Sequence, residues 1–115
     1  MEIRENISLR NHNTMGIDAH ARYFAEVHDI DDLKKAVNWQ KSKGVELLVL
    51  GGGSNILFTS DYKGLVIHNK IEGRVTIQES DEMVHLYVGA GENWHNLVRF
   101  TVNSNLYGIE NLALI

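Results

Sequence analysis

The clearest chemistry in this sequence lies in a run of three glycines followed by two polar residues, Leu50-Gly51-Gly52-Gly53-Ser54-Asn55. Glycine lets the backbone adopt positive φ and approach a ligand closely, so successive N–H groups can converge on a phosphate. Ser54 and Asn55 add side-chain hydrogen-bond donors. The run predicts either a phosphate-binding loop or a tight surface turn without a ligand, because a glycine motif alone does not separate the two.

Two familiar phosphate-binding motifs do not fit this run. A P-loop requires Lys and then Ser or Thr after the glycines, whereas Asn55-Ile56 ends this one. A Rossmann glycine motif opens a long helix, but Asp61 to Gly64 interrupts the chain within a few residues. The pattern is instead a strand, a glycine loop and a second strand, and ligands favour the carboxyl ends of parallel strands.

The remaining candidate residues give weaker signals. Gly89-Ala90-Gly91 is typical of a bulge or of close strand packing, and the helical spacing of Trp94 favours a core position. Glu92 and Glu110 show no pairing suited to acid–base catalysis, so we expect solvated carboxylates. No two of the six histidines have the i,i+4 spacing of a helical zinc site, and the sequence has no cysteine. We therefore expect no catalytic residue and no metal ligand in this chain.

The glycine run is expected to join two strands. Leu47–Leu50 and Leu65–His68 are short apolar runs, typical of parallel strands covered on both faces. We predict that they are neighbouring parallel strands. Residues 22–27, rich in aromatic and β-branched side chains, predict an earlier strand. Asp29 as N-cap and Gly44 as C′ residue bound a helix between that strand and the glycine run, which makes a strand–helix–strand unit.

The second part of the chain has a different pattern. Apolar residues alternate in 75–77 and in 84–88 on either side of Ser80-Asp81-Glu82, which predicts an antiparallel hairpin with one solvated face. Asn93 can cap a second helix whose apolar stripe is Trp94, Leu97, Val98, Thr101 and Val102. The polar segment from Ile7 to Ala21 is expected to be irregular. The pattern predicts an α+β fold, a small βαββ unit followed by a hairpin and a helix.

Composition limits the partners. The net charge is −4, and no Lys/Arg cluster is large enough to bind nucleic acid. No apolar stretch is long enough to cross a membrane, and the first residues lack the apolar core of a signal peptide. We expect a cytoplasmic protein. The apolar end, Leu112-Ala113-Leu114-Ile115, predicts that the chain continues further in its parent protein, and that self-association through this end is possible.

Four stretches resemble one enzyme family in the same order along the chain. They are Asn13-Thr14-Met15-Gly16-Ile17, Leu50 to Leu57, Val88 to Trp94, and Gly108 to Ile115. The family is UDP-N-acetylenolpyruvoylglucosamine reductase, also called UDP-N-acetylmuramate dehydrogenase. Met15 departs from the family's usual phenylalanine, and Gly52 occupies a variable position of the glycine motif.

This resemblance implies an FAD-binding domain of the vanillyl-alcohol-oxidase (PCMH) type, with a first FAD-binding subdomain in residues 1–70 and the start of a second in 71–115. It implies that Leu50, Gly51, Gly52, Gly53, Ser54 and Asn55 bind the FAD diphosphate. The family uses NADPH and FAD to reduce UDP-N-acetylglucosamine enolpyruvate to UDP-N-acetylmuramate, a precursor of peptidoglycan and hence of the cell wall.

The resemblance also implies that the family's catalytic serine, arginine and glutamate lie outside these 115 residues, so the chain alone should be inactive and should bind FAD weakly or not at all. Two alternatives stay open at this point. One is the FAD-binding part of another oxidase of the same fold, and the other is a non-enzymatic α+β domain whose glycine loop is structural.

Overall fold

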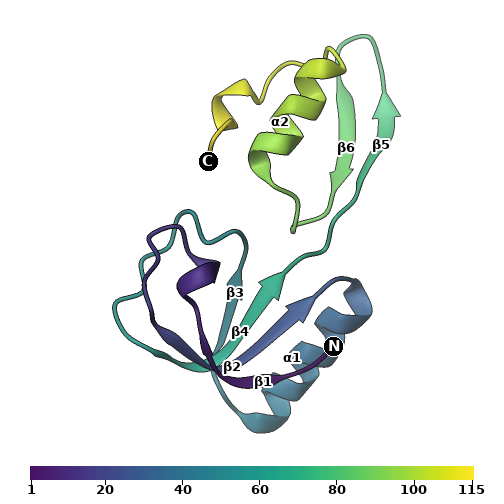
Figure 1. Ribbon diagram of the computed structural model, residues 1–115. Coiled ribbons are helices and arrows are strands. Elements are labelled where there is room, and N and C mark those ends of the chain that lie inside the picture. Colours follow the sequence, from purple (N-terminus) through teal and green to yellow (C-terminus); the bar gives the residue numbers. More distant parts are fainter. The chain divides into compact units, whose positions relative to one another are not determined.

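The computed structural model describes residues 1–115 and divides into two compact units, Met1–Ile71 and Glu72–Ile115 (Figure 1). Both combine strands with a helix, so the α+β class predicted from the sequence is confirmed. The assignment of residues 1–70 and 71–115 to two FAD-binding subdomains stays a prediction. None of the helices is long and apolar enough to cross a bilayer.

The first unit is a four-stranded sheet with the strand order β1-β2-β4-β3. Its strands are β1 (Arg4–Ser8), β2 (His20–Val27), β3 (Leu47–Leu50) and β4 (Tyr62–Asn69). β2 and β3 both run parallel to β4, and β1 runs antiparallel to β2. The register from Leu47↔Leu65 to Leu50↔His68 confirms the prediction that these two runs are neighbouring parallel strands.

Helix α1 (Ile30–Lys43) makes the crossover from β2 to β3 and begins and ends where the sequence predicted. The Asp29 side chain accepts a hydrogen bond from the N–H of Asp32, and Gly44 adopts the left-handed conformation at the C-cap. Ala36 packs with Ala25, Val27, Leu65 and Ile67 on one face of the sheet. These residues form the first of two buried clusters in the unit.

The opposite face of the sheet has no α-helix over it, only the short 3-10 helix Arg10–His12. Its buried cluster is Leu9, Ala19, Ala21, Phe24, Leu50, Phe58 and Val66. Leu9 and Ala19 belong to the segment between β1 and β2, and Phe58 to the segment between β3 and β4. These two connections therefore cover the face, and the second of them contains the glycine run.

Two expectations for this unit are wrong. Residues 4–8 form strand β1, although the sequence reads as polar and irregular from Ile7 onward; a polar strand at a sheet edge lacks an alternating apolar signal. β3 was expected to be covered on both faces, but Leu47 and Val49 are exposed. β3 is the other edge strand of the sheet, and α1 packs against the central strands. Only β4 has the fully buried run.

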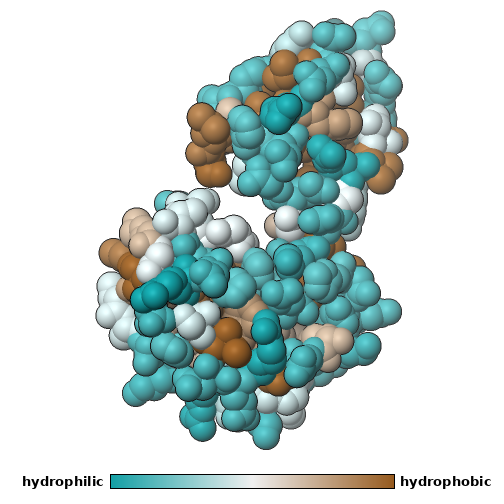
Figure 2. Space-filling view, in the orientation of Figure 1, coloured by the Kyte–Doolittle hydropathy of each residue, from teal (hydrophilic) through white to brown (hydrophobic).

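The second unit contains a two-stranded antiparallel sheet, β5 (Arg74–Glu79) and β6 (Val84–Val88), followed by helix α2 (Trp94–Asn103). The hairpin is confirmed, but its apolar residues do not share one face. Val75 pairs with Tyr87 and Thr76 with Leu86, so Val75 points away from the half-buried side of β6. Val75 and Ile77 are more than half exposed, and brown apolar patches interrupt the teal surface of this unit in Figure 2.

Helix α2 is capped as predicted, because the Asn93 side chain accepts a hydrogen bond from the N–H of Asn96. It ends just before Asn105, which has φ +58° and lets the N–H of Leu106 donate to the carbonyl of Thr101. Leu97, Val98 and Thr101 are buried. The core position expected for Trp94 is wrong, since this side chain is 45% exposed.

Candidate functional site

The glycine run Gly51–Asn55 starts directly at the carboxyl end of β3, as the sequence predicted. Gly51, Gly52, Ser54 and Asn55 are exposed, and no atom outside their immediate neighbours lies near the Cβ positions of Gly51 and Gly52. None of the N–H groups of residues 51–55 donates a hydrogen bond within the protein. The loop therefore has a run of unused backbone donors, with open space at Gly51 and Gly52, which suits an anion site.

Gly53 fixes the loop to the rest of the unit. It is buried and has φ +71°, and a Cβ here would overlap the carbonyl oxygen of His12 and lie 2.7 Å from Asn13 Cα. Its own carbonyl accepts hydrogen bonds from Thr14, at 3.0 Å from the backbone N–H and 3.5 Å from Oγ1. Only glycine meets both conditions, so the third glycine of the run serves close packing while the first two stay open.

The segment that contacts Gly53, residues 12–14, is the support of the glycine loop. The buried side-chain amide of Asn13 fixes its conformation. Its Nδ2 donates to the carbonyls of Leu9 at 2.7 Å and Ile17 at 3.0 Å, and its Oδ1 accepts from the Ile17 N–H at 3.0 Å. A buried amide with three satisfied hydrogen bonds strongly restricts the local backbone. Asn13 thus determines the shape of the support on which the glycine loop rests.

Two histidines lie beside this support. The His12 ring packs 4.8 Å from the Phe24 ring and 5.0 Å from the His68 ring, measured between centroids. His68 pairs with Leu50 across the sheet, so it stands next to the residue from which the glycine loop starts. Both histidines are partly buried, in an aromatic cluster over β2 and β4.

The charges around the histidines centre on one carboxylate, Glu26. Its oxygens lie 3.9 Å from Arg4 Nη2, 3.7 Å from Lys70 Nζ, 3.7 Å from His28 Nε2 and 3.8 Å from His68 Nδ1. The last distance is too long for a hydrogen bond, and His68 Nδ1 is buried without a partner. No group of three or more His, Cys, Asp or Glu side chains is arranged to hold a metal ion.

These surroundings lower the pKa values of His12, His68 and Glu26. Burial lowers the pKa of His12 below 6.5, Arg4 and Lys70 lower it further, and Glu26 acts in the opposite direction. Burial and then the charge of His12 lower the pKa of His68, again against Glu26. Burial alone would raise the pKa of Glu26, but Lys70, His68 and Arg4 together hold it below its ordinary value. At neutral pH both rings are therefore uncharged and Glu26 is ionised.

The second glycine segment, Gly89–Gly91, uses the N–H and the carbonyl of Gly89 within the fold. The N–H of Gly89 donates to the carbonyl of Gly73 at 2.8 Å, which extends the hairpin pairing. Glu92 Oε1 accepts from the Gly73 N–H at 2.8 Å and lies 4.0 Å from Arg74 Nε. Glu92 is thus not the solvated carboxylate expected from the sequence, whereas Glu110 is exposed as expected and accepts from the N–H of Gly108. This segment serves the local structure.

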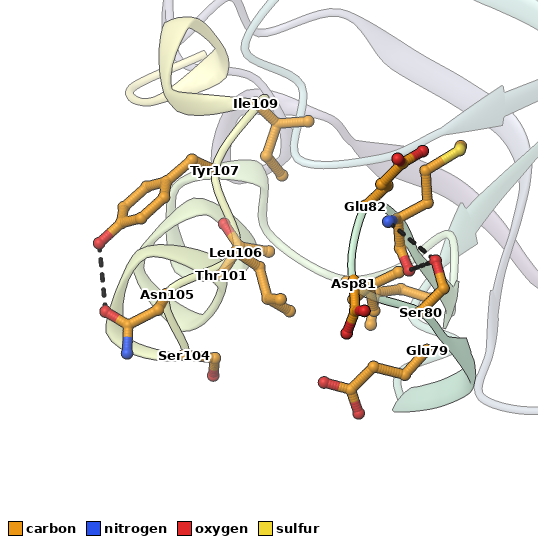
Figure 3. A pocket seen from close by; sticks show the side chains of 13 residues that line it. Glu79, Ser80, Asp81, Glu82, Thr101, Ser104, Asn105, Leu106, Tyr107 and Ile109 are labelled. Carbon is orange, nitrogen blue, oxygen red and sulfur yellow. Dashed lines mark hydrogen bonds between the residues drawn. The ribbon is translucent and has the colours of Figure 1, made fainter.

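The second unit also has a cavity of about 500 Å³, between the hairpin turn and the chain that follows α2 (Figure 3). Glu79, Asp81 and Glu82 line one side. On the other side, the Tyr107 hydroxyl donates to Asn105 Oδ1 at 3.1 Å. No basic residue lines this cavity, and its three carboxylates would repel a diphosphate. The open loop of the first unit is the better anion site.

A known family model decides which group of proteins this chain resembles. The model described as FAD binding domain matches residues 21–115. The chain belongs to this family of FAD-binding domains. FAD is therefore the ligand to consider for the open loop Gly51–Asn55.

Individual relatives agree with the match. UDP-N-acetylenolpyruvoylglucosamine reductase from Flavobacterium johnsoniae is 44% identical over 115 residues, which are 100% of this chain and 34% of that protein. The reductase of the same name from Escherichia coli K12 is 44% identical over 110 residues, 96% of this chain and 32% of that protein. The chain spans about a third of the length of these relatives.

Among solved structures, the UDP-N-acetylenolpyruvylglucosamine reductase from Thermus caldophilus superimposes with a TM-score of 0.71. It is 25% identical, and the match covers 99% of this chain and 39% of that one. Together with the family match, this confirms both the resemblance stated from the four motifs and the vanillyl-alcohol-oxidase-type α+β fold.

The sequence pointed to the loop but missed its support. Asn13-Thr14 and Gly51–Asn55 were identified as separate motifs, and the structure brings them into contact across about 40 residues of chain. The adjacency of His12, His68 and Glu26 was also missed, because these residues lie on different elements. The only signal in the sequence was the presence of a second motif of unknown purpose, Asn13 to Ile17.

Proposed function

We propose that residues 50–55 bind the diphosphate of FAD through the free N–H groups of the loop. The support for the proposal is the run of unused donors at the end of a parallel strand, together with the contact between the buried Gly53 and Thr14. The loop fits a diphosphate because Gly51 and Gly52 leave open space above the backbone. A preformed loop also loses little conformational entropy when its ligand binds.

We further propose that the whole protein is a cytoplasmic reductase acting on UDP-N-acetylglucosamine enolpyruvate with NADPH, in the synthesis of peptidoglycan precursors. The support is the name and the 44% identity of the relatives, together with the FAD-binding family of this chain. Bound flavin would supply hydride transfer between NADPH and the enolpyruvyl group. The residues described here would contribute binding and orientation of the cofactor, since none of them forms a candidate acid–base pair.

Diphosphate recognition can be tested on the chain itself. FAD, ADP and riboflavin are titrated in parallel, and binding is followed by isothermal calorimetry. FAD and ADP share the diphosphate that riboflavin lacks, so we expect measurable binding of the first two and at least tenfold weaker binding of riboflavin. Equal affinity for riboflavin and FAD would contradict the proposed role of the loop.

The catalytic proposal is tested on the product of the complete reading frame. We expect a yellow protein that consumes NADPH when UDP-N-acetylglucosamine enolpyruvate is added. A colourless protein would contradict the FAD site, whereas a yellow protein that leaves NADPH unchanged would indicate another oxidoreductase of this fold.

Self-association through Leu112–Ile115 also remains a proposal. Leu114 is 83% exposed and has φ +63°, so its side chain is available to a partner. Light scattering of Leu114→Asp beside the unchanged chain tests it: a smaller particle for the variant supports the contact, and an identical particle contradicts it.

A further inference from the structure

The His12–His68 pair stands between the sheet and the segment that supports the glycine loop. The His12 ring rests on Phe24, which is fully buried, while the backbone of the same residue touches Gly53. One residue thus connects the core of the first unit to the loop. We expect a change in the packing of the His12 ring to move Asn13-Thr14 and, through Thr14, Gly53.

The charged groups that face the pair come from each element packed against it. They are Arg4 from β1, Glu26 from β2, His28 just after β2, and His68 and Lys70 from β4 and the residue that follows it. Arg4 and Lys70 already outnumber the single carboxylate of Glu26. Protons on both rings therefore add positive charge that Glu26 does not neutralise.

Resting on the proposed FAD site, we propose that His12 is a positioning residue of the glycine loop: its neutral ring, tilted against Phe24 and edge-to-face with His68, holds Asn13-Thr14 against Gly53, and protonation of the His12–His68 pair in acid loosens this contact and weakens FAD binding. The rings lie 5.0 Å apart, so two charges at this distance would repel one another in a partly buried place. The loop responds because only Thr14 donates to the Gly53 carbonyl.

The direction of the pH effect follows from the lowered pKa of both histidines. A group whose pKa is lower in the folded state stabilises that state above its unfolded pKa, here 6.5, and loses this contribution as the pH falls below it. Both rings are therefore neutral near pH 7.5, and the contact between Thr14 and Gly53 should weaken toward about pH 5.

Two substitutions of His12 separate the effect of ring packing from the effect of ring charge. His12→Phe keeps an aromatic ring on Phe24 and cannot be protonated, whereas His12→Ala removes the ring. His68→Leu removes the partner charge and keeps apolar contact, which gives a second route to the same result. His85→Phe is the matched control, because His85 is exposed on β6 in the other unit.

The first readout needs no cofactor. Hydrogen-exchange protection of the Thr14 amide is measured at about pH 7.5 and about pH 5, corrected for intrinsic exchange. We expect at least fivefold lower protection in acid for the unchanged chain and for His85→Phe. Protection should be constant with pH in His12→Phe and His68→Leu, and low at both pH values in His12→Ala. A constant value in the unchanged chain, or an acid loss retained in both His12→Phe and His68→Leu, would overturn the proposal.

The second readout is the dissociation constant for FAD under the same conditions. We expect at least threefold weaker binding in acid for the unchanged chain and less than twofold change for His12→Phe. FAD binding that does not change with pH while Thr14 protection does would overturn the link from the support to the cofactor. Absence of FAD binding at both pH values in the product of the complete reading frame, with the protection pattern intact, would contradict the proposed function and leave the positioning role of His12 supported.

Discussion

The two glycine segments of this protein look alike in sequence and differ in how their backbone groups are used. In Gly51–Asn55 the N–H groups have no partner within the protein, and the loop rests on a distant segment through Gly53 and Thr14. In Gly89–Gly91 the N–H of Gly89 completes a hairpin, and Glu92 beside it accepts from Gly73. A glycine motif thus indicates a ligand site only where the fold leaves its donors free.

The largest expected effect comes from Gly53→Ala. A methyl group here would overlap the His12 carbonyl, and alanine disfavours φ +71°. We expect the free energy of unfolding to fall by about 3 kcal/mol, measured by urea denaturation. Gly52→Ala is the matched control, because nothing lies within 4 Å of its Cβ position, and it should change stability by less than about 1 kcal/mol. Equal losses for the two variants would show that the loop is not fixed at Gly53.

A smaller but still large effect is expected for Asn13→Ala. The substitution leaves the buried backbone groups of Leu9 and Ile17 without their partners, at a cost of about 2 kcal/mol. Asn38→Ala, an exposed asparagine within α1, should change the unfolding free energy by no more than about 0.5 kcal/mol. If Asn13→Ala were as mild as Asn38→Ala, the support of the glycine loop would not depend on the buried amide.

The smallest effect concerns the second glycine segment. Glu92→Ala removes one charged acceptor from the Gly73 N–H, and we expect a loss of about 1 kcal/mol in the stability of the second unit. Glu82→Ala in the exposed hairpin turn should be neutral. Because Gly89–Gly91 is structural, Glu92→Ala should leave the affinity for FAD within twofold of the unchanged chain. A larger loss of affinity would assign this segment a role in binding.

Local sequence predicted those features that depend on neighbours in the chain. The caps of α1 at Asp29 and Gly44, the cap of α2 at Asn93, and the hairpin were correct because each is determined by a few adjacent residues. The pairing of β3 with β4 also followed from two apolar runs. The glycine loop itself was identified by its residue types and its place after a strand.

Features that depend on distant contacts were not predictable in this way. Leu47 and Val49 have the composition of a covered strand, but β3 lies at the sheet edge, and strand order is not encoded in the run itself. The support of Gly53 joins residues about 40 positions apart, and His12, His68 and Glu26 meet only after β2 and β4 have paired. Periodicity and capping rules contain no information about such contacts.

Backbone amide chemical shifts can show whether the free N–H groups of residues 51–55 bind the diphosphate of FAD. ¹⁵N-labelled protein is titrated with FAD, a measurement that also detects weak binding. We expect the amide signals of Gly51, Gly52, Gly53, Ser54 and Asn55 to shift most and those of Gly89 and Gly91 to stay in place. Shifts confined to the acidic cavity of the second unit or to Gly89–Gly91, with residues 51–55 unchanged, would contradict it.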